Sequence, residues 1–253
     1  MVVDDRRIAL WDEESRRIIA ETKVALEEHV RPFISRACTH VKGHGGMKRC
    51  IRDVQRHLPD YPFVARFDVA SYYDTISHEI LLHQLAESGC PSPLMGAVYL
   101  SPLDAAFDAM GDAILYRRYM DDFVILARTR RQLRWAIKKV HHILAGLKQT
   151  VHKKKRFIGR TTAGFDFLGY RLHPNRRLRP SAESITRLKI HARRLYERGA
   201  SHDRLWRYVV RWCSWLWGGV YGRVSRKGGV RKYCVLVAKE LGMDESVPMY
   251  IGL

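Results

Sequence analysis

The feature that most constrains the fold is an acidic pair held between two apolar segments. Ile114–Tyr119 and residues 123–127 are rich in β-branched and aromatic residues, and they flank Met120, Asp121 and Asp122. Two such segments joined by so short a connection predict a β-hairpin with the acidic pair at or beside its turn. An antiparallel sheet is therefore expected in the fold.

A third carboxylate is predicted to end a separate strand. Residues 63–69 are short, apolar and β-rich, which places Asp68 at the end of a buried strand. Phosphoryl transfer needs mainly charge neutralisation and in-line positioning, and carboxylates that hold two divalent ions provide both. The alternative is that Asp121 and Asp122 are ordinary turn residues, because Asp is common in turns.

The rest of the chain is predicted to be mostly helical around this sheet. Apolar residues recur at helical spacing through residues 133–147, with Arg and Lys on the other face, which predicts an amphipathic helix packed on the sheet. The other expected elements are helices over 12–30, 48–58 and 77–85, a loop entering a helix over 92–110, a strand or hairpin over 165–172, a basic linker over 174–180, and helices after Pro180. Four tryptophans of this last region are expected in its core rather than as platforms for bases: Trp206, Trp212, Trp215 and Trp217.

Charge points to a polyanionic partner. Lys and Arg number 45 against 26 Asp and Glu, a net charge of +19 that is spread over most of the length. Nucleic acid is the favoured partner, and a solvated basic surface is the alternative. The five cysteines show no paired metal-ligand spacing, which predicts free thiols in a reducing cytoplasm and no zinc site. The first residues are charged and no apolar run reaches membrane-spanning length, so neither secretion nor membrane insertion is expected.

Several ordered motifs resemble those of reverse transcriptases. Tyr119-Met120-Asp121-Asp122 is similar to their signature box, and residues 67–78 resemble their other catalytic strand. Residues 92–104, 152–159 and 165–172 resemble, in the right order, the template-side helix, the lysine-bearing strand and the primer-grip hairpin. The resemblance covers residues 41–195 and is greatest to the group II intron-like bacterial enzymes. Ser92-Pro93 stands where enzymes of diversity-generating retroelements typically carry Ser-Gln.

The resemblance implies a metal-dependent active site. Asp68 and Asp121 would bind two Mg²⁺ ions, for which Mn²⁺ could substitute, and Asp122 would support them. The backbone of Val69 would help to hold the metal and the triphosphate.

It also implies contacts with the nucleotide. Ser71, Tyr72 and Tyr73 would border the nucleotide, with Tyr73 as the steric gate that excludes a 2′-hydroxyl; a core tyrosine is the alternative. Lys155 best matches the lysine near the incoming phosphates, although Lys153 and Lys154 leave its register open.

The remaining implied contacts are with primer and template. Ser92 and Pro93 would lie on the template side, and the primer end would be positioned by Phe167, Leu168, Gly169 and Tyr170. The implied partners are an RNA template, a DNA or RNA primer and deoxynucleoside triphosphates.

The fold class expected from the resemblance is α+β, a right-hand polymerase palm with an antiparallel sheet, flanking helices and a helical thumb. Residues 1–60 would form partial fingers, residues 61–175 the palm, and residues 176–253 a basic helical thumb. Two departures stand out: the connection from Leu85 to Pro93 is far shorter than in the family, and few finger residues precede the palm. A partial gene, a chain completed by a protein partner and a miniature enzyme would each explain them.

The expected function is RNA-directed DNA synthesis, in which deoxynucleotides are added to a primer on an RNA template. A maturase-like RNA-binding protein without catalytic activity is the alternative. An RNA-synthesising palm polymerase is disfavoured by Tyr73. A role in a mobile element and a role in antiviral defence are both left open by the residues.

Overall fold

The structure is a computed structural model, and it describes residues 2–3, 6–7, 12–18, 20–21, 34–88, 93–220 and 222–243. Most of the helix predicted over 12–30 lies outside the described residues, and so does Ser92. Within the described parts, no helix combines the length and the apolar character needed to cross a membrane.

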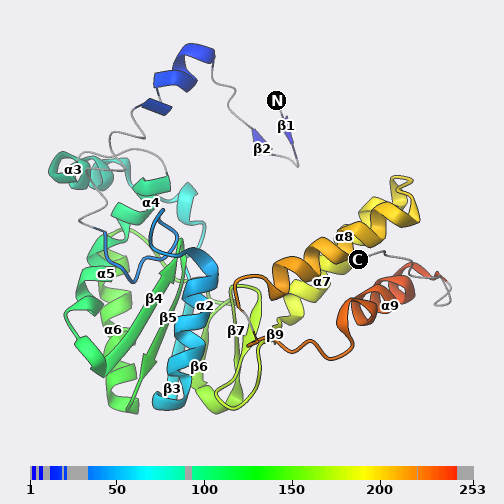
Figure 1. Cartoon of the computed structure of the whole chain (residues 1–253). Helices are drawn as coiled ribbons and strands as arrows, with labels where there is room; N and C mark the ends of the chain where they lie inside the picture. Colours follow the sequence, from blue (N-terminus) through cyan, green and yellow to red (C-terminus); the bar gives the residue numbers. More distant parts are fainter. Residues whose placement is uncertain are drawn as a thin grey trace.

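A four-stranded antiparallel sheet forms the centre of the larger part of the molecule (Figure 1). Its strands are β3 (Phe63–Asp68), β4 (Ile114–Tyr119), β5 (Asp122–Ala127) and β6 (Phe157–Arg160), in the order β4-β5-β3-β6. The predicted hairpin and the predicted strand ending at Asp68 are therefore confirmed. The lysine-bearing strand predicted over 152–159 begins only at Phe157, so Lys155 lies in the turn before it.

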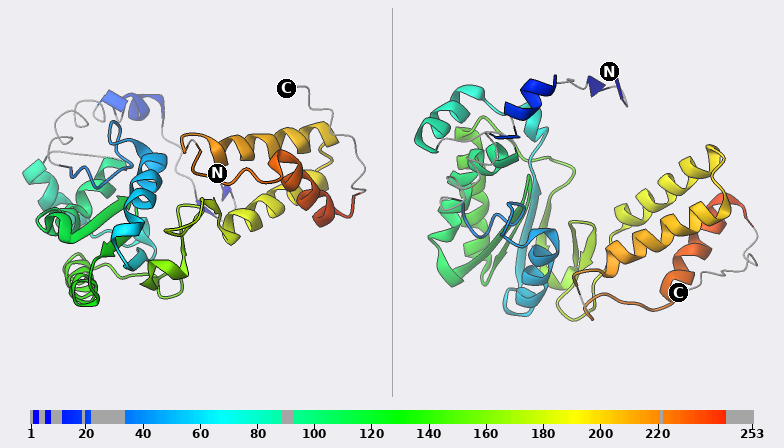
Figure 2. Two further views of the ribbon diagram at one scale, coloured as in Figure 1. Left: turned by 60° about the horizontal axis from the view of Figure 1, so that its bottom comes forward. Right: turned by 45° about the horizontal axis from the view of Figure 1, so that its top comes forward.

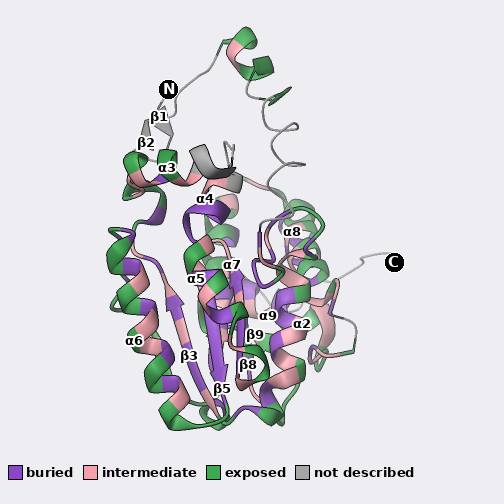
Figure 3. Cartoon of the chain, turned by 90° about the vertical axis from the view of Figure 1, so that its left-hand side faces the viewer, coloured by how far each residue is buried: buried purple, intermediate pink, exposed green. Residues whose placement is uncertain are grey.

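The two faces of the sheet are covered by different elements, because side chains alternate along each strand. Phe67, Phe123 and Ile125 pack with the buried residues of α5 (Ser101–Asp108) and α6 (Arg130–Gly146). Val64, Val124 and Leu126 pack with α2 (Gly46–His57) and the C-terminal region. Figure 3 shows the buried strands between α6 on one side and α2 on the other.

Helix α6 shows how local sequence specifies an element. Thr129 caps its first turn by accepting a hydrogen bond from the Gln132 amide, and the Gln132 side chain accepts one from the Thr129 amide. Its buried positions follow the helical period: Leu133, Ala136, Val140 and Leu144. The predicted amphipathic helix is confirmed.

A small three-stranded sheet joins this part to the C-terminal helices (Figures 1 and 2). Its strands are β7 (Phe165–Phe167), β8 (Tyr170–Leu172) and β9 (Arg179–Pro180), and the helices are α7 (Ala182–Glu197), α8 (His202–Trp217) and α9 (Gly229–Leu241). The predicted hairpin and the helices after Pro180 are confirmed. The linker predicted over 174–180 is wrong at its end, because Leu178 is buried and the strand β9 follows it.

The segment predicted as a loop entering one helix contains two helices instead. α4 (Pro93–Tyr99) and α5 are separated at Leu100, and Pro102 lies in the first turn of α5, where a missing amide hydrogen costs nothing. The remaining described elements are β1 (Val2–Val3), β2 (Arg6–Arg7), η2 (Leu58–Asp60), η3 (Tyr72–Asp74), α3 (His78–Ser88), η4 (Gly111–Ala113) and η5 (Thr161–Ala163).

The tryptophans of the C-terminal region do not share one environment. Trp206 is buried, as predicted, whereas Trp215 is 36% exposed. The prediction that Trp215 belongs to the core is therefore wrong, and its ring lines a cavity described below.

Candidate active site

The fold brings the three predicted carboxylates to one edge of the sheet. Asp68 ends β3 and lies directly opposite Asp122, the first residue of β5. Directly opposite residues of an antiparallel pair point to the same face, so these two side chains are neighbours. The Val69 amide donates a hydrogen bond to the Asp121 carbonyl oxygen at 3.1 Å, which ties the end of β3 to the hairpin turn.

The turn between β4 and β5 has an unusual backbone. Tyr119 pairs with Asp122, so Met120 and Asp121 form a two-residue turn, and Met120 has a φ of +57°. That region favours glycine, because a Cβ atom there crowds the backbone. Such strain persists only where the surroundings hold it in place, and strained residues are common at functional sites.

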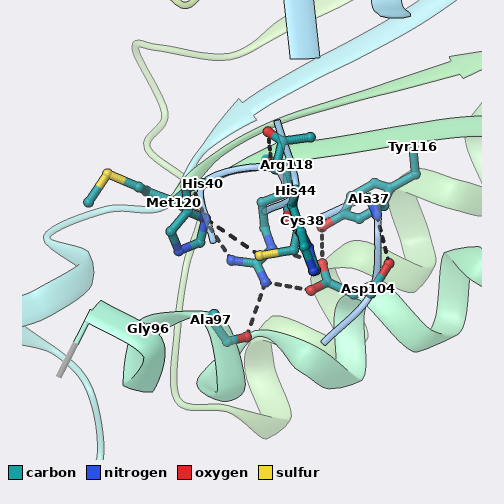
Figure 4. A network of polar contacts seen from close by, with 12 residues as sticks. Ala37, Cys38, His40, His44, Gly96, Ala97, Asp104, Tyr116, Arg118 and Met120 are labelled. Carbon is teal, nitrogen blue, oxygen red and sulfur yellow. Dashed lines mark hydrogen bonds and ion pairs between the residues drawn. The ribbon is translucent and has the colours of Figure 1, made fainter. Parts of the chain in front are cut away.

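Both backbone groups of Met120 are held by neighbouring side chains (Figure 4). Its amide donates to His40 Nδ1 at 3.0 Å, and its carbonyl oxygen accepts from Arg118 Nη1 at 3.0 Å. His40 is brought there by residues 37–39, since the Arg118 amide donates to Ala37 at 2.9 Å and the Thr39 amide donates to the Arg118 carbonyl at 2.8 Å. The loop before α2 thus becomes part of the turn's support.

Arg118 is the centre of a buried polar network that was not predicted from the sequence. Its side chain is 0% exposed and forms an ion pair with Asp104 of α5, which is 1% exposed. Arg118 also donates to the Ala97 carbonyl of α4 at 3.1 Å, and the Tyr116 hydroxyl donates to Asp104 at 2.8 Å. In β4, the residues that share a face of the strand with Arg118 are buried. An arginine at such a position was the signal available in the sequence.

Two cations lie against the carboxylates. Arg66 donates to Asp122 Oδ1 through Nε at 3.0 Å and through Nη2 at 2.7 Å. Lys155 Nζ lies 3.6 Å from Asp68 Oδ1. The structure thus selects Lys155, among the three candidate lysines, as the one beside a carboxylate. Arg66 was not predicted, although its place two residues before Asp68 puts it on the same face of β3.

Burial and repulsion between neighbouring carboxylates raise the pKa values of Asp121 and Asp122. Burial raises the pKa of Asp122 to about 6, against the opposing effect of Arg66. The pKa of Asp121 is also raised, first by burial and then by the negative charge of Asp68. A divalent cation would relieve this repulsion, and carboxylate oxygens are the ligands that Mg²⁺ prefers.

The donor set for such an ion is small. Among the described residues, no group of three or more His, Cys, Asp or Glu side chains is arranged to hold a metal ion. Asp122 is engaged by Arg66, which leaves Asp68 and Asp121 as the carboxylates that could bind metal directly. A pair of carboxylates with several open positions fits Mg²⁺, which retains water ligands.

The structure separates the three predicted nucleotide contacts near β3. Tyr72 is buried and its hydroxyl donates to the Gly96 carbonyl of α4, so its ring belongs to the core and not to an open site. Tyr73 is 52% exposed, and the negative charge of Asp121 contributes, after burial, to raising its pKa. Ser71 is exposed with a φ of +46° at the start of η3. Of these three residues, Tyr73 is thus the exposed aromatic one.

The predicted primer contacts are also divided between core and surface. Phe167 and Tyr170 are buried, and the Tyr170 hydroxyl donates to the Leu216 carbonyl at 2.7 Å. Leu168 and Gly169 form the turn between β7 and β8 and are part of the lining of a cavity of about 430 Å³. Phe167 lines this cavity too, so that of the four predicted residues only Tyr170 takes no part in its lining.

This cavity connects the candidate site with the C-terminal helices. Arg66 and Asp122 line it from the sheet, and Trp215 lines it from α8. Pro93, predicted on the template side, begins α4, whose Gly96 lies against the rings of Tyr72 and Tyr73.

Comparisons with known proteins give a relationship of fold and none of sequence. No family model matches the sequence, and no curated protein sequence matches it. The structure is similar to that of a telomerase from Candida albicans, solved with a TWJ fragment of telomeric RNA, with a TM-score of 0.50 and 11% identity. The match covers 93% of this chain and 56% of that one, so this chain spans little more than half of its structural neighbour. At this identity the similarity shows the fold alone, a mixed α/β fold with antiparallel sheets.

Proposed function

We propose that this chain is an RNA-directed DNA polymerase, a reverse transcriptase of the bacterial group II intron-like kind. The observation that carries the proposal is the meeting of Asp68, Asp121 and Asp122 at one edge of an antiparallel sheet. The similarity of fold to a telomerase supports it, and so does the net charge of +19. Residues 61–175 would then be the palm, residues 176–253 the thumb and residues 1–60 a partial fingers region.

The site residues would divide the work of nucleotide addition. Mg²⁺, or Mn²⁺ in its place, would neutralise the triphosphate and lower the pKa of the primer 3′-hydroxyl. Asp68 and Asp121 would hold it, while Arg66 keeps the Asp122 carboxylate in place behind them. The Lys155 ammonium would interact with the phosphates.

The flanking residues would select and position the substrates. Tyr73, exposed beside Asp121, would stand against the sugar and exclude a 2′-hydroxyl. Leu168 and Gly169 would support the primer end at the mouth of the cavity that Trp215 lines. The exposed ring of Trp215 offers a surface on which a base can stack.

Primer extension on poly(rA)/oligo(dT) with Mg²⁺ or Mn²⁺ tests the proposal directly. We expect incorporation of dTMP by the wild-type chain and its loss in Asp121→Asn, because a carboxamide carries no charge to hold a metal. Asp60→Asn is the matched control, since Asp60 is exposed at the far end of β3 and should leave incorporation unchanged.

The same experiment separates the proposal from a maturase-like RNA-binding function. The ion pairs of Asp122 with Arg66 and of Asp68 with Lys155 are the observation that favours a non-catalytic protein, since they partly neutralise the site without metal. No incorporation by the wild type, with equal RNA affinity in wild type and Asp121→Asn, would show that this chain alone is a binder or awaits a protein partner.

A further inference from the structure

An exposed basic stripe runs along α6, on the side of the molecule away from the candidate active site. Five exposed side chains recur at helical spacing and define what is here named the α6 stripe: Arg131, Arg134, Trp135, Lys138 and His142. Eleven helical steps of 1.5 Å give the stripe a length of about 16 Å. Trp135 is 45% exposed at its centre, which is unusual for so large an apolar ring.

The chain segment that carries the stripe contains no acidic residue. Residues 123–165 contain twelve Lys and Arg and no Asp or Glu. No Asp or Glu in the described part of the chain forms an ion pair with Arg131, Arg134 or Lys138. Such a face attracts a polyanion, and the attraction carries no cost of breaking existing pairs.

The stripe is separate from the candidate active site. The buried side of α6 packs on the face of the sheet that carries Phe67 and Phe123, whereas Asp68, Asp122 and Arg66 point to the opposite face. Figure 1 shows α6 and the C-terminal helices on opposite sides of the strands. A nucleic-acid strand bound in the cavity near Trp215 therefore does not reach the α6 stripe without passing around the sheet.

We infer that the α6 stripe is a second RNA-binding surface, which holds the sugar-phosphate backbone of an RNA outside the polymerising site. Arg and Lys at spacings of three and four residues contact successive phosphates, and an exposed indole stacks on a base or a sugar. A membrane surface is a poor alternative partner, because the apolar face of α6 is buried in the core. The choice of RNA over DNA rests on the proposed function, in which a long RNA template extends beyond the site.

The test compares two triple variants of the full chain that lose equal charge. The first is Arg131→Gln, Arg134→Gln and Lys138→Gln; the control is Lys42→Gln, Arg56→Gln and Arg160→Gln, which changes exposed cations outside both the α6 stripe and the proposed thumb. Affinity for a fluorescent RNA hairpin is measured from 0.05 to 0.3 M salt, with a DNA hairpin of the same sequence beside it. Circular dichroism and thermal unfolding verify that each variant is folded.

We expect the first variant to lose about tenfold or more in RNA affinity at 0.15 M salt, and its salt slope to fall by about 2 to 3, since each phosphate contact contributes about 0.7 to 0.9. The control should lose less than about threefold. Equal losses in the two variants, or an unchanged affinity in the first, would overturn the inference, and an equal effect on the DNA hairpin would overturn the choice of RNA. Binding is read without catalysis, so a wild type that binds through the stripe but extends no primer would refute the proposed function and leave this inference standing.

Discussion

At the scale of single residues, the site depends on a few buried polar contacts with high individual cost. Arg118 joins the strained Met120 turn to Asp104 and to α4. A buried ion pair contributes little net stability when both partners are present, but removal of one partner leaves a buried, unpaired charge. Stability and activity should therefore respond differently to single and paired changes here.

Arg118→Met alone should lower the free energy of unfolding by about 3 to 5 kcal/mol, because Asp104 is left buried without its partner. Arg118→Met with Asp104→Asn should recover most of that loss in urea unfolding. Primer extension should stay low in the double variant, because nothing replaces the donor to the Met120 carbonyl. Activity that returns together with stability would show that Arg118 does not position the turn.

The raised pKa of Asp122 makes a prediction about pH. Its folded pKa of about 6 lies above the ordinary value of 3.8, so the folded state holds the proton more tightly than the unfolded state. Protonated Asp122 therefore stabilises the folded state. This stabilisation, on the order of 2 kcal/mol, is fully present below about pH 4 and is lost as the pH rises through about 6. Urea unfolding at pH 4 and pH 7 should show that wild type loses this much relative to Asp122→Asn; parallel pH profiles would contradict the shift.

Tyr73 tests which aromatic residue faces the nucleotide. Tyr73→Ala should raise the incorporation of ribonucleotides relative to deoxynucleotides by tenfold or more, on the order of 1.4 kcal/mol in discrimination, because the ring no longer blocks the 2′-hydroxyl. Tyr73→Phe should keep the wild-type ratio. The readout is the ratio of kcat/KM for dTTP and UTP, and a ratio insensitive to the alanine change would refute the assignment.

At the scale of elements, two hairpin turns position residues of the candidate site, and each turn contains a residue with a positive φ angle. Leu168 and Gly169 have φ angles of +47° and +80° in the turn between β7 and β8, a combination typical of a type I′ hairpin. A Cβ atom at Gly169 would lie 3.0 Å from the Trp215 ring, so the turn and α8 approach each other closely there. This contact sets the shape of the cavity wall.

Gly169→Ala should therefore destabilise the chain more than an equal change at an open position. We expect a loss of about 2 to 3 kcal/mol in the free energy of unfolding, from backbone strain together with the contact on Trp215. Gly111→Ala is the matched control, because Gly111 has a φ of +52° and nothing lies within 4 Å of its added Cβ. Equal losses of stability in the two variants would show that the Trp215 ring moves aside without an energetic cost.

At the scale of the whole molecule, α2 links the sheet to the C-terminal helices. Lys48 lies over the rings of Tyr170 and Trp215 and donates to the Tyr170 hydroxyl and the Trp215 carbonyl. Arg52 donates to the Gly219 carbonyl at 2.9 Å. These contacts join residues more than a hundred positions apart along the chain.

Lys48→Ala should weaken this junction. We expect a loss of about 1 to 3 kcal/mol in the free energy of unfolding, because the cation–π contacts and hydrogen bonds of the ammonium are lost together. Lys42→Ala serves as the control, since Lys42 is exposed in the loop before α2. Urea unfolding measures both, and an equal, small effect would mean that the two parts are held by apolar contacts alone.

The elements whose folding information is local follow from the order of the amino acids alone. The hairpin around Met120 and Asp121, the strand that ends at Asp68 and the amphipathic α6 were all predicted, because strand and helix periods are written in neighbouring residues. The meeting of the carboxylates at one edge followed from the motifs that resemble reverse transcriptases.

Which side chains are exposed and which are buried depends on the assembled fold. The fold buries Tyr72 and leaves Tyr73 and Trp215 exposed. Among the three candidate lysines, it brings Lys155 beside a carboxylate. The pairing of Arg118 with Asp104 was likewise decided there. Such outcomes depend on contacts between segments that are distant in the chain, and the free energy of burying a charge or a ring is set by those partners rather than by its sequence neighbours.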